Sequence, residues 1–385
     1  MKTGFFVLAA ALFLSACNEK SKVVDPSTLP QGSAGNVFGD TSYIQMQPVW
    51  AGFYGPKDIK IGFDDILYVT EPDSNRVAMV NLAGSMLGYS RYVKHPVSIA
   101  QDRRFNLLIA CEYDTTVGGQ PVTVAAIAKI RLFDYQHEIA NAPVEIVVHE
   151  SPQRQIVRDA GGDVISGRVY TGVAVLADNS YYVTRSGSQN SSPIDPDNMI
   201  LHFSKNDHKY SSDLIDLVPN PVNLTPTGTG LVAINQLSNI TTFNSRQFGS
   251  DFIVTQTDPE NAYKVKWFTF SAGTELKAPE WVSKFSVDPT QYSPPVLPDI
   301  LGNIFVAPRA VTIDDRGNIY VIDSGLDSLM KFDLKGRLLR ESFGPSKADS
   351  PLLNPSGVTF FDRTLYISDT GHNRILRYRL STDLR

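Results

Sequence analysis

Residues 355–375 read PSGVTFFDRTLYISDTGHNRI, and two other stretches of the chain follow the same plan. They are residues 308–332, PRAVTIDDRGNIYVIDSGLDSLMKF, and residues 56–77, PKDIKIGFDDILYVTEPDSNRV. In each, a proline precedes a short apolar run, a second run contains a tyrosine at nearly the same distance from that proline, and a third run follows. Apolar runs of this length between Asp- and Gly-containing turns are typical of short strands. Each copy therefore predicts three consecutive strands joined by tight turns.

Three weaker copies lie between these stretches, so that the chain has six units of unequal length. The units begin near residues 56, 96, 171, 239, 308 and 355. Repeats of this size with four strands each predict a β-propeller, in which each blade buries its faces against its neighbours. The last unit shows only three strands, and one unassigned strand, Tyr43 to Trp50, precedes the first unit. We predict an all-β, six-bladed propeller closed by this N-terminal strand; an open sandwich or two stacked domains is the alternative.

Two turn segments carry a family resemblance. Residues 367–375, ISDTGHNRI, resemble the signature of NHL repeats, and residues 69–77, VTEPDSNRV, are a close variant. The fifth unit shares Asp323-Ser324-Gly325 and then departs from the pattern where Asn-Arg is usual. The chain is thus similar to NHL/TolB-like propellers, over the whole domain as architecture and over about half of it as motif. Such propellers are diverse in function, so the resemblance implies a fold and little chemistry.

The composition is that of a packed globular protein. The 385 residues carry a formal net charge of −5, with 42% hydrophobic and 19% charged residues. These values exclude a disordered chain, a collagen-like chain and a polytopic membrane protein. The mild acidity also argues against nucleic acid as a partner, because nucleic-acid binders normally present a basic face.

The first residues read as an export signal. Lys2 precedes an apolar core, residues 5–14, that is too short to span a bilayer as a helix. Residues 14–17, LSAC, resemble the lipobox of bacterial lipoproteins. The resemblance implies cleavage before Cys17 and lipidation of this cysteine, which anchors a protein stably when two or more chains are attached. A plain secretory signal with an incidental cysteine is the alternative.

These features divide the chain into three parts. Residues 1–16 are predicted to be the lipoprotein signal peptide, and residues 17–41 the lipidated cysteine with a flexible tether rich in Ser, Gly, Pro and Asn. Residues 42–385 are predicted to form the propeller. We expect an exported protein of the bacterial cell envelope that contacts the membrane through its lipid anchor, the outer membrane in a Gram-negative cell.

Insertions in the predicted propeller fall on one face, which we call the long-loop face. The loop between the second and third strands of a blade emerges there, together with the connection to the next blade. The long segments are residues 113–125, 150–168, 186–198, 219–238 and 287–307. Long loops on a rigid scaffold are where binding residues gather. We therefore expect a binding site on this face, with functionless loop drift as the alternative.

One position in each unit is predicted to lie at the mouth of the central channel on this face. It is the last residue of the second strand, and we call its occupants the strand-end residues: Glu71, Cys111, Arg185, Gln256, Asp323 and Asp369. Arg309, which follows the proline that opens the fifth unit, is a further candidate at the channel mouth. Cys111 is expected to be a small buried residue rather than a nucleophile.

The charged strand-end residues suggest two kinds of ligand. Glu71, Asp323 and Asp369 belong to blades that are contiguous once the ring closes, so they are the candidates for a metal such as calcium. Arg185 lies across the ring and is the candidate for a carboxylate or phosphate. In NHL repeats the acidic residue at this place commonly supports the following turn, and we favour that structural role for Glu71 and Asp369. Arg185 and Asp323 depart from the motif and are favoured as functional residues.

Two functional classes remain open. We favour a non-enzymatic binding or scaffold protein that presents the long-loop face to an unknown protein, peptide or small-molecule ligand and requires no cofactor. The alternative is a hydrolase or lyase that resembles the calcium-dependent lactonases or strictosidine synthase and works in the propeller channel. No nucleophile elbow, P-loop or zinc spacing of histidines occurs in the sequence, so no catalytic residue is assigned.

We predict that Cys17→Ser releases the protein from membranes, because the predicted tether and propeller contain no other hydrophobic anchor. Fractionation of cells that express either protein measures this. A variant that stays in the membrane fraction after a high-salt wash would contradict the lipid anchor.

Overall fold

The structure, a computed structural model, describes residues 42–154, 157–158, 164–165, 167–192, 195–208, 222, 224–228, 230–243, 249–275, 278–285, 297–344 and 352–384. The predicted signal peptide, Cys17 and tether lie outside these residues. Within them, no helix has both the length and the apolar composition needed to cross a membrane.

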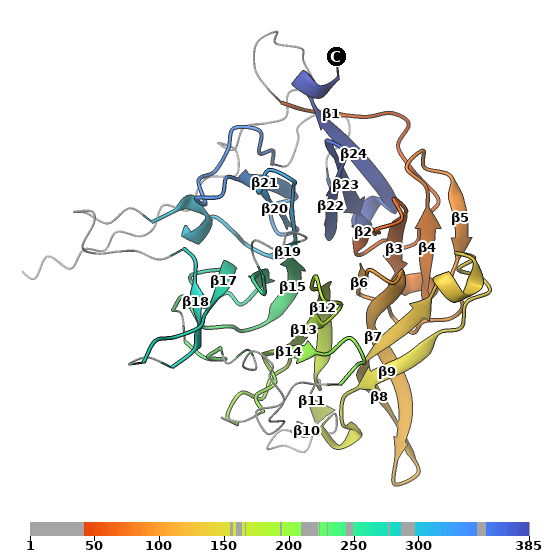
Figure 1. The fold of residues 1–385 in the computed structure, drawn as a ribbon, viewed down its shortest axis with the longest axis vertical. Coiled ribbons are helices and arrows are strands. Elements are labelled where there is room, and N and C mark those ends of the chain that lie inside the picture. Colours follow the sequence, from red (N-terminus) through yellow and green to blue (C-terminus); the bar gives the residue numbers. More distant parts are fainter. Residues whose placement is uncertain are drawn as a thin grey trace, which may run out of the picture.

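Six sheets, the blades, stand around a central channel (Figure 1). The strand named first in each blade is the innermost one. Blade I consists of β2 (Ile59–Ile61), β3 (Leu67–Glu71), β4 (Arg76–Val80) and β5 (Met86–Tyr89). Blade II consists of β6 (Ser98–Gln101), β7 (Asn106–Val117), β8 (Gln120–Arg131) and β9 (Glu145–His149). Blade III consists of β12 (Val169–Val175), β13 (Tyr181–Ser186) and β14 (Met199–Phe203).

The other three blades complete the ring. Blade IV consists of β15 (Leu237–Thr242), β16 (Phe252–Gln256), β17 (Val265–Ser271) and β18 (Glu280–Ser283). Blade V consists of β19 (Pro308–Ile313), β20 (Ile319–Asp323) and β21 (Ser328–Phe332), and blade VI of β22 (Gly357–Phe361), β23 (Thr364–Asp369), β24 (Arg374–Leu380) and β1 (Tyr43–Gln45). The prediction of an all-β, six-bladed propeller is confirmed.

The remaining elements are short. A separate two-stranded ribbon joins β10 (Val157–Arg158) to β11 (Val164–Ile165). The described helices are all 3₁₀ turns: η2 (Pro72–Ser74), η3 (Phe133–Tyr135), η4 (Pro152–Arg154), η6 (Asp299–Leu301), η7 (Thr370–His372) and η8 (Ser381–Asp383).

The N-terminal strand closes the ring as predicted. β1 pairs antiparallel with β24 in the register Tyr43↔Leu380, and further along Trp50 forms an isolated bridge with Ile375. Sequence positions 43–50 thus occupy the outer place of the last blade, although the regular ladder is shorter than the predicted strand. The phenol of Tyr43 is buried and hydrogen-bonds Tyr320 of blade V at 3.0 Å.

The apolar runs are continuous because each strand is covered on both faces. All five residues of β20 are buried. Ile319 and Val321 pack with Trp267 of blade IV, whereas Tyr320 and Ile322 belong to the cluster shared with blade VI. Successive side chains point to opposite faces of a strand, so each blade contributes half of two separate cores.

Two elements differ from the sequence prediction. Residues 113–125 were expected to form an inserted loop, but β7 and β8 continue through them as a hairpin paired as far as Val117↔Gln120. Gly118 and Gly119 form its turn with positive φ values of 56° and 80°, which glycine adopts without strain. Blade V lacks a regular fourth strand in the described residues, where residues 338–343 provide isolated bridges to β21 instead.

We predict that deleting residues 43–50 lowers the melting temperature of the whole domain. The deletion removes the buried Tyr43 and exposes the edge of β24, and truncating one buried aromatic residue alone costs about 3 kcal/mol. A chain that begins at Ser42 is the matched control. Equal thermal melts of the two proteins would show that ring closure contributes nothing to stability.

Candidate functional site

The channel opens on the long-loop face into a cavity of about 520 Å³, which we call the mouth pocket. Each blade contributes one residue at or just before the start of its innermost strand: Lys57, Val97, Thr171, Ser238, Arg309 and Ser356. Val124 and Ala125 from the β7–β8 hairpin and Gly167 and Arg168 before β12 add to the wall. Segments that were singled out as long insertions therefore do border a cavity.

Two cations flank one side of this pocket. Ser356 lies on blade VI between Arg309 of blade V and Lys57 of blade I, and its hydroxyl donates to the Lys57 carbonyl at 2.8 Å. In the part of the chain that the structure describes, neither the Lys57 ammonium nor the Arg309 guanidinium has a hydrogen bond or ion pair. Burial lowers the pKa of Lys57, and the positive charge of Arg309 lowers it further. The two charges thus lie close enough to repel each other without an acid between them.

Other parts of the pocket carry different chemistry. His95 Nδ1 lies 3.1 Å from Glu112 Oε1, and both side chains are partly exposed. Asn239 is only 3% exposed, and its side-chain oxygen has no hydrogen-bond partner among the described residues. An unpaired buried amide oxygen is costly, so it is a group that a ligand can satisfy.

Cys111 also lines the pocket, and it is inert as predicted. Its side chain is buried, and burial raises the pKa of the thiol to about 12. The thiolate, which is the nucleophile, is therefore scarce at neutral pH.

The acidic strand-end residues of blades I and VI hold loops together. Glu71 accepts hydrogen bonds from the Tyr54 backbone N–H at 3.1 Å and from Arg76 Nε at 2.6 Å. Asp369 accepts equivalent bonds from the Leu353 N–H and from Arg374. Each carboxylate is fully buried and joins the incoming connection to the turn that follows its own strand. This geometry is the one expected if Glu71 and Asp369 support the turns that follow their strands.

Asp323 and Gln256 occupy the same place in their blades. Asp323 accepts bonds from the backbone N–H groups of Val306 and Ala307, at 2.7 and 2.9 Å, and Gln256 accepts one from Asn235 at 3.0 Å. Burial raises the pKa of Asp323, and these backbone donors oppose the rise. Asp323 was favoured as a functional residue, but it is fully buried and binds its own connection, so the structure gives it no free group at the mouth.

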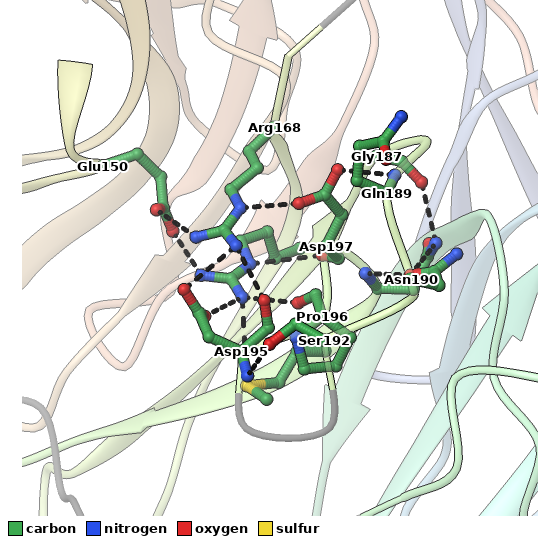
Figure 2. A network of polar contacts seen from close by, with 12 residues as sticks. Glu150, Arg168, Gly187, Gln189, Asn190, Ser192, Asp195, Pro196 and Asp197 are labelled. Atoms are coloured by element: carbon green, nitrogen blue, oxygen red, sulfur yellow. Dashed lines mark hydrogen bonds and ion pairs between the residues drawn. The ribbon is translucent and has the colours of Figure 1, made fainter. Parts of the chain in front are cut away.

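Arg185 differs most from its predicted position. It is only 1% exposed and donates to Glu150 at 2.8 Å and to Asp195 at 2.6 Å. Arg168 binds the same two acids and also Asp197 (Figure 2). The two guanidiniums therefore bind three carboxylates in all, and both bind Glu150 and Asp195. We expected Arg185 to lie at the channel mouth and to offer its charge to a ligand. Instead, its guanidinium is buried and its charge is neutralised by acids of the protein.

This network shifts the pKa values of its acids. Burial raises the pKa of Asp195, but the hydrogen bond and charge of Arg185, together with Arg168, outweigh burial and bring it to about 2. The same balance leaves the pKa of Glu150 below its ordinary value. Glu150 and Asp195 are therefore ionised near neutral pH, and the network holds the segment from Asp195 to Asp197 against the start of β12.

The predicted metal set is not assembled. Glu71, Asp323 and Asp369 each bind their own connection, and among the described residues no three His, Cys, Asp or Glu side chains group so as to hold a metal ion. The mouth pocket offers one accessible carboxylate, Glu112, which pairs with His95. Calcium takes six to eight oxygen ligands with several carboxylates, so this donor set does not fit it.

The other end of the channel holds a second cavity, of about 720 Å³. It is lined by the ends of the innermost strands and includes Lys60 and the acidic turn residues Asp65, Asp314, Asp315 and Asp362. The two mouths thus carry opposite charge, cationic on the long-loop face and acidic on the other.

Comparison with known proteins supports the fold. No family model and no curated protein matches the chain. Solved structures do match: a candidate oxidoreductase (glucose dehydrogenase) from Thermus thermophilus has a TM-score of 0.56 and 14% identity, over 88% of this chain and 100% of that one. The PQQ-bound aldose sugar dehydrogenase from Streptomyces coelicolor has a TM-score of 0.54 and 11% identity, over 89% and 99%. A luciferin-regenerating enzyme has a TM-score of 0.51 and 12% identity, over 89% and 95%.

At these identities the likeness establishes a shared β-propeller fold and nothing finer. The chain is similar in fold to propeller enzymes, and no family match confirms membership of the NHL group, which stays a prediction.

Sequence reasoning found Arg309 but missed Lys57, Ser356, His95, Glu112 and Asn239. A signal for the first two was present: Lys57, Arg309 and Ser356 each follow the proline that opens a unit. Once one such position lies at the channel mouth, the repeat places the others there too. His95, Glu112 and Asn239 carry no comparable signal, because their relation depends on contacts between blades.

We predict that Arg185→Met destabilises the fold by about 3–5 kcal/mol, because it leaves Glu150 and Asp195 without half of their positive partners. Denaturant unfolding measures this. Arg309→Met, which removes an exposed guanidinium, is the matched control and should leave stability nearly unchanged. Equal losses in the two variants would show that the network adds no specific stability.

Stability should also fall in acid. In an unfolded chain the pKa values of Asp and Glu are about 4. In the folded protein the pKa values of Asp195 and Glu150 lie below this. Their contribution is therefore complete above about pH 5 and is lost as pH falls through about 4 toward 2. Thermal melts between pH 7 and pH 3 test this, and a flat profile would contradict the assignment.

Proposed function

We propose that the protein is a binding propeller that takes a small organic anion into its mouth pocket through Lys57 and Arg309. The observation that carries the proposal is a pair of cations that share a concave pocket with no acid partner in the described chain. Bringing two positive charges together costs energy in the empty protein, and an anion between them removes that cost. The proposal keeps the predicted binding role and the long-loop face but moves the site from Arg185 to Arg309 and its neighbours.

The pocket has the size and lining for such a ligand. Its volume of about 520 Å³ lies in the range of small-molecule sites. Arg309 offers a planar fork that suits a carboxylate, and Lys57 offers a compact charge. Val97, Val124 and Ala125 supply an apolar wall, and the amide of Asn239 supplies a polar contact deeper in the channel.

A second candidate function is catalysis on the bound anion. His95 and Glu112 form a pair in which the carboxylate can orient the imidazole for proton transfer. The similarity in fold to propeller enzymes supports this candidate over a pure scaffold role. A calcium-dependent lactonase-like mechanism receives no support from the donor set of the mouth pocket.

We further propose that this propeller is of the NHL type and is held at the envelope of a bacterium by a lipid on Cys17. The support is the repeat motif around Asn75-Arg76 and Asn373-Arg374 and the lipobox-like LSAC sequence. In this arrangement the lipid anchor precedes β1, the outer strand of blade VI.

We predict that Lys57→Met and Arg309→Met each weaken binding of small carboxylates by about ten- to a hundredfold, because a charge-assisted hydrogen bond is worth about 1.5–3 kcal/mol. A panel of lactate, succinate and citrate, screened by thermal shift and followed by calorimetry, measures the affinities. Lys60→Met, at the other mouth, is the control and should bind normally. Equal affinity of all three variants and the native protein would refute the site.

A further inference from the structure

Lys57 has an amine that the protein does not use. The charged groups around it are Arg309, Asp58, Asp73 and Glu112. Asp58 is occupied by Ser98 Oγ at 2.7 Å and the Ile99 N–H at 3.0 Å, and Glu112 pairs with His95. No carboxylate in the described residues forms an ion pair with Lys57. These three acids raise the pKa of Lys57, but burial and the positive charge of Arg309 outweigh them.

Such surroundings favour the neutral amine. Burial lowers the pKa of Lys57 and the charge of Arg309 lowers it further, so more of the amine is unprotonated at neutral pH than for an exposed lysine. A lysine beside a second cation in a partly desolvated pocket is a known way to obtain a nucleophilic amine. The other lysines with a lowered pKa are already engaged: Lys264 donates to the Val306 carbonyl, the fully buried Lys266 donates to the Gly230 carbonyl, and Lys284 lies over the ring of Trp267.

We infer that Lys57 forms an imine with the carbonyl carbon of a small oxo acid whose carboxylate is held by Arg309. This inference rests on the proposed anion site and names its substrate class. The geometry behind it is the order Arg309, Ser356, Lys57 on three successive blades, which places a carboxylate-binding group and an amine on one side of the same cavity. An oxo acid whose carbonyl is adjacent to its carboxylate offers a carboxylate to Arg309 and a carbonyl carbon to Lys57.

The step balances without an oxidant or reductant. The lone pair of Lys57 Nζ attacks the carbonyl carbon, and the carbonyl oxygen takes a proton to become a hydroxyl group. The nitrogen gives up its two protons as this oxygen, protonated again, leaves as water and the C=N bond forms. One carbonyl and one amine thus yield one imine and one water. His95, which pairs with Glu112 and lines the same pocket, is the group we assign to donate and accept these protons.

The test compares pyruvate, which has a carbonyl next to its carboxylate, with lactate, which has a hydroxyl there. The whole protein is incubated with each probe and sodium cyanoborohydride, which reduces an imine to a stable secondary amine, and the modified lysines are mapped by mass spectrometry. With pyruvate, Lys57 should be modified faster than Lys60 by on the order of tenfold or more. Lactate should give no adduct.

Two variants separate this inference from the proposed function. Lys57→Arg removes the primary amine, so pyruvate with cyanoborohydride should give no adduct at position 57. Arg309→Met should slow the labelling of Lys57 by pyruvate by about tenfold, because it removes the carboxylate partner. Labelling of Lys57 no faster than Lys60, in a protein that binds lactate through Lys57 and Arg309, would overturn the imine and leave the anion site intact. Absence of lactate binding in the native protein would overturn the site as well.

Discussion

The arrangement of the channel mouth depends on one repeated contact, between the strand-end residue of a blade and the connection that enters that blade. Glu71 binds the N–H of Tyr54, Asp323 binds those of Val306 and Ala307, and Asp369 binds that of Leu353. Each bound N–H lies two or three residues before the residue that lines the mouth pocket: Lys57, Arg309 and Ser356, respectively. Because the acceptors are buried and fully engaged, they fix where the connection turns into the channel.

The same contact explains why the charges of the repeat are structural. Glu71 and Asp369 also bind Arg76 and Arg374, the arginines that complete the NHL-like motif. A buried carboxylate needs several donors to offset the loss of water, and the motif supplies them within one blade. Blade III solves the problem with reversed charge, since Arg185 is the strand-end residue there and the acids come from Glu150 and Asp195. Where the strand-end residue is positive instead of negative, its partners in the adjoining loops are therefore carboxylates instead of backbone N–H groups.

The sequence was sufficient for the fold because the information is local and repeated. Apolar runs of strand length recur six times, and the unassigned strand Tyr43–Trp50 fits the outer position that the last unit leaves open. The partners of Arg185 and Asp323 could not be predicted, since they come from connections of irregular length whose path no periodic pattern records. The β7–β8 hairpin was mistaken for a loop because its polar residues, which face solvent on both sides, lack the alternation that indicates a strand.

Function in such a ring is most free to vary where the repeat imposes no residue type. Lys57, Arg309 and Ser356 share their position with Val97, Thr171 and Ser238, a set that ranges from a cation to an apolar side chain. Lys57, Arg309 and Ser356 are absent from the buried clusters that hold the blades together, so these positions can change without repacking those cores. Two cations on one side of the mouth are thus a property of this chain and not of its architecture. That property, rather than the motif, carries the information about its ligand.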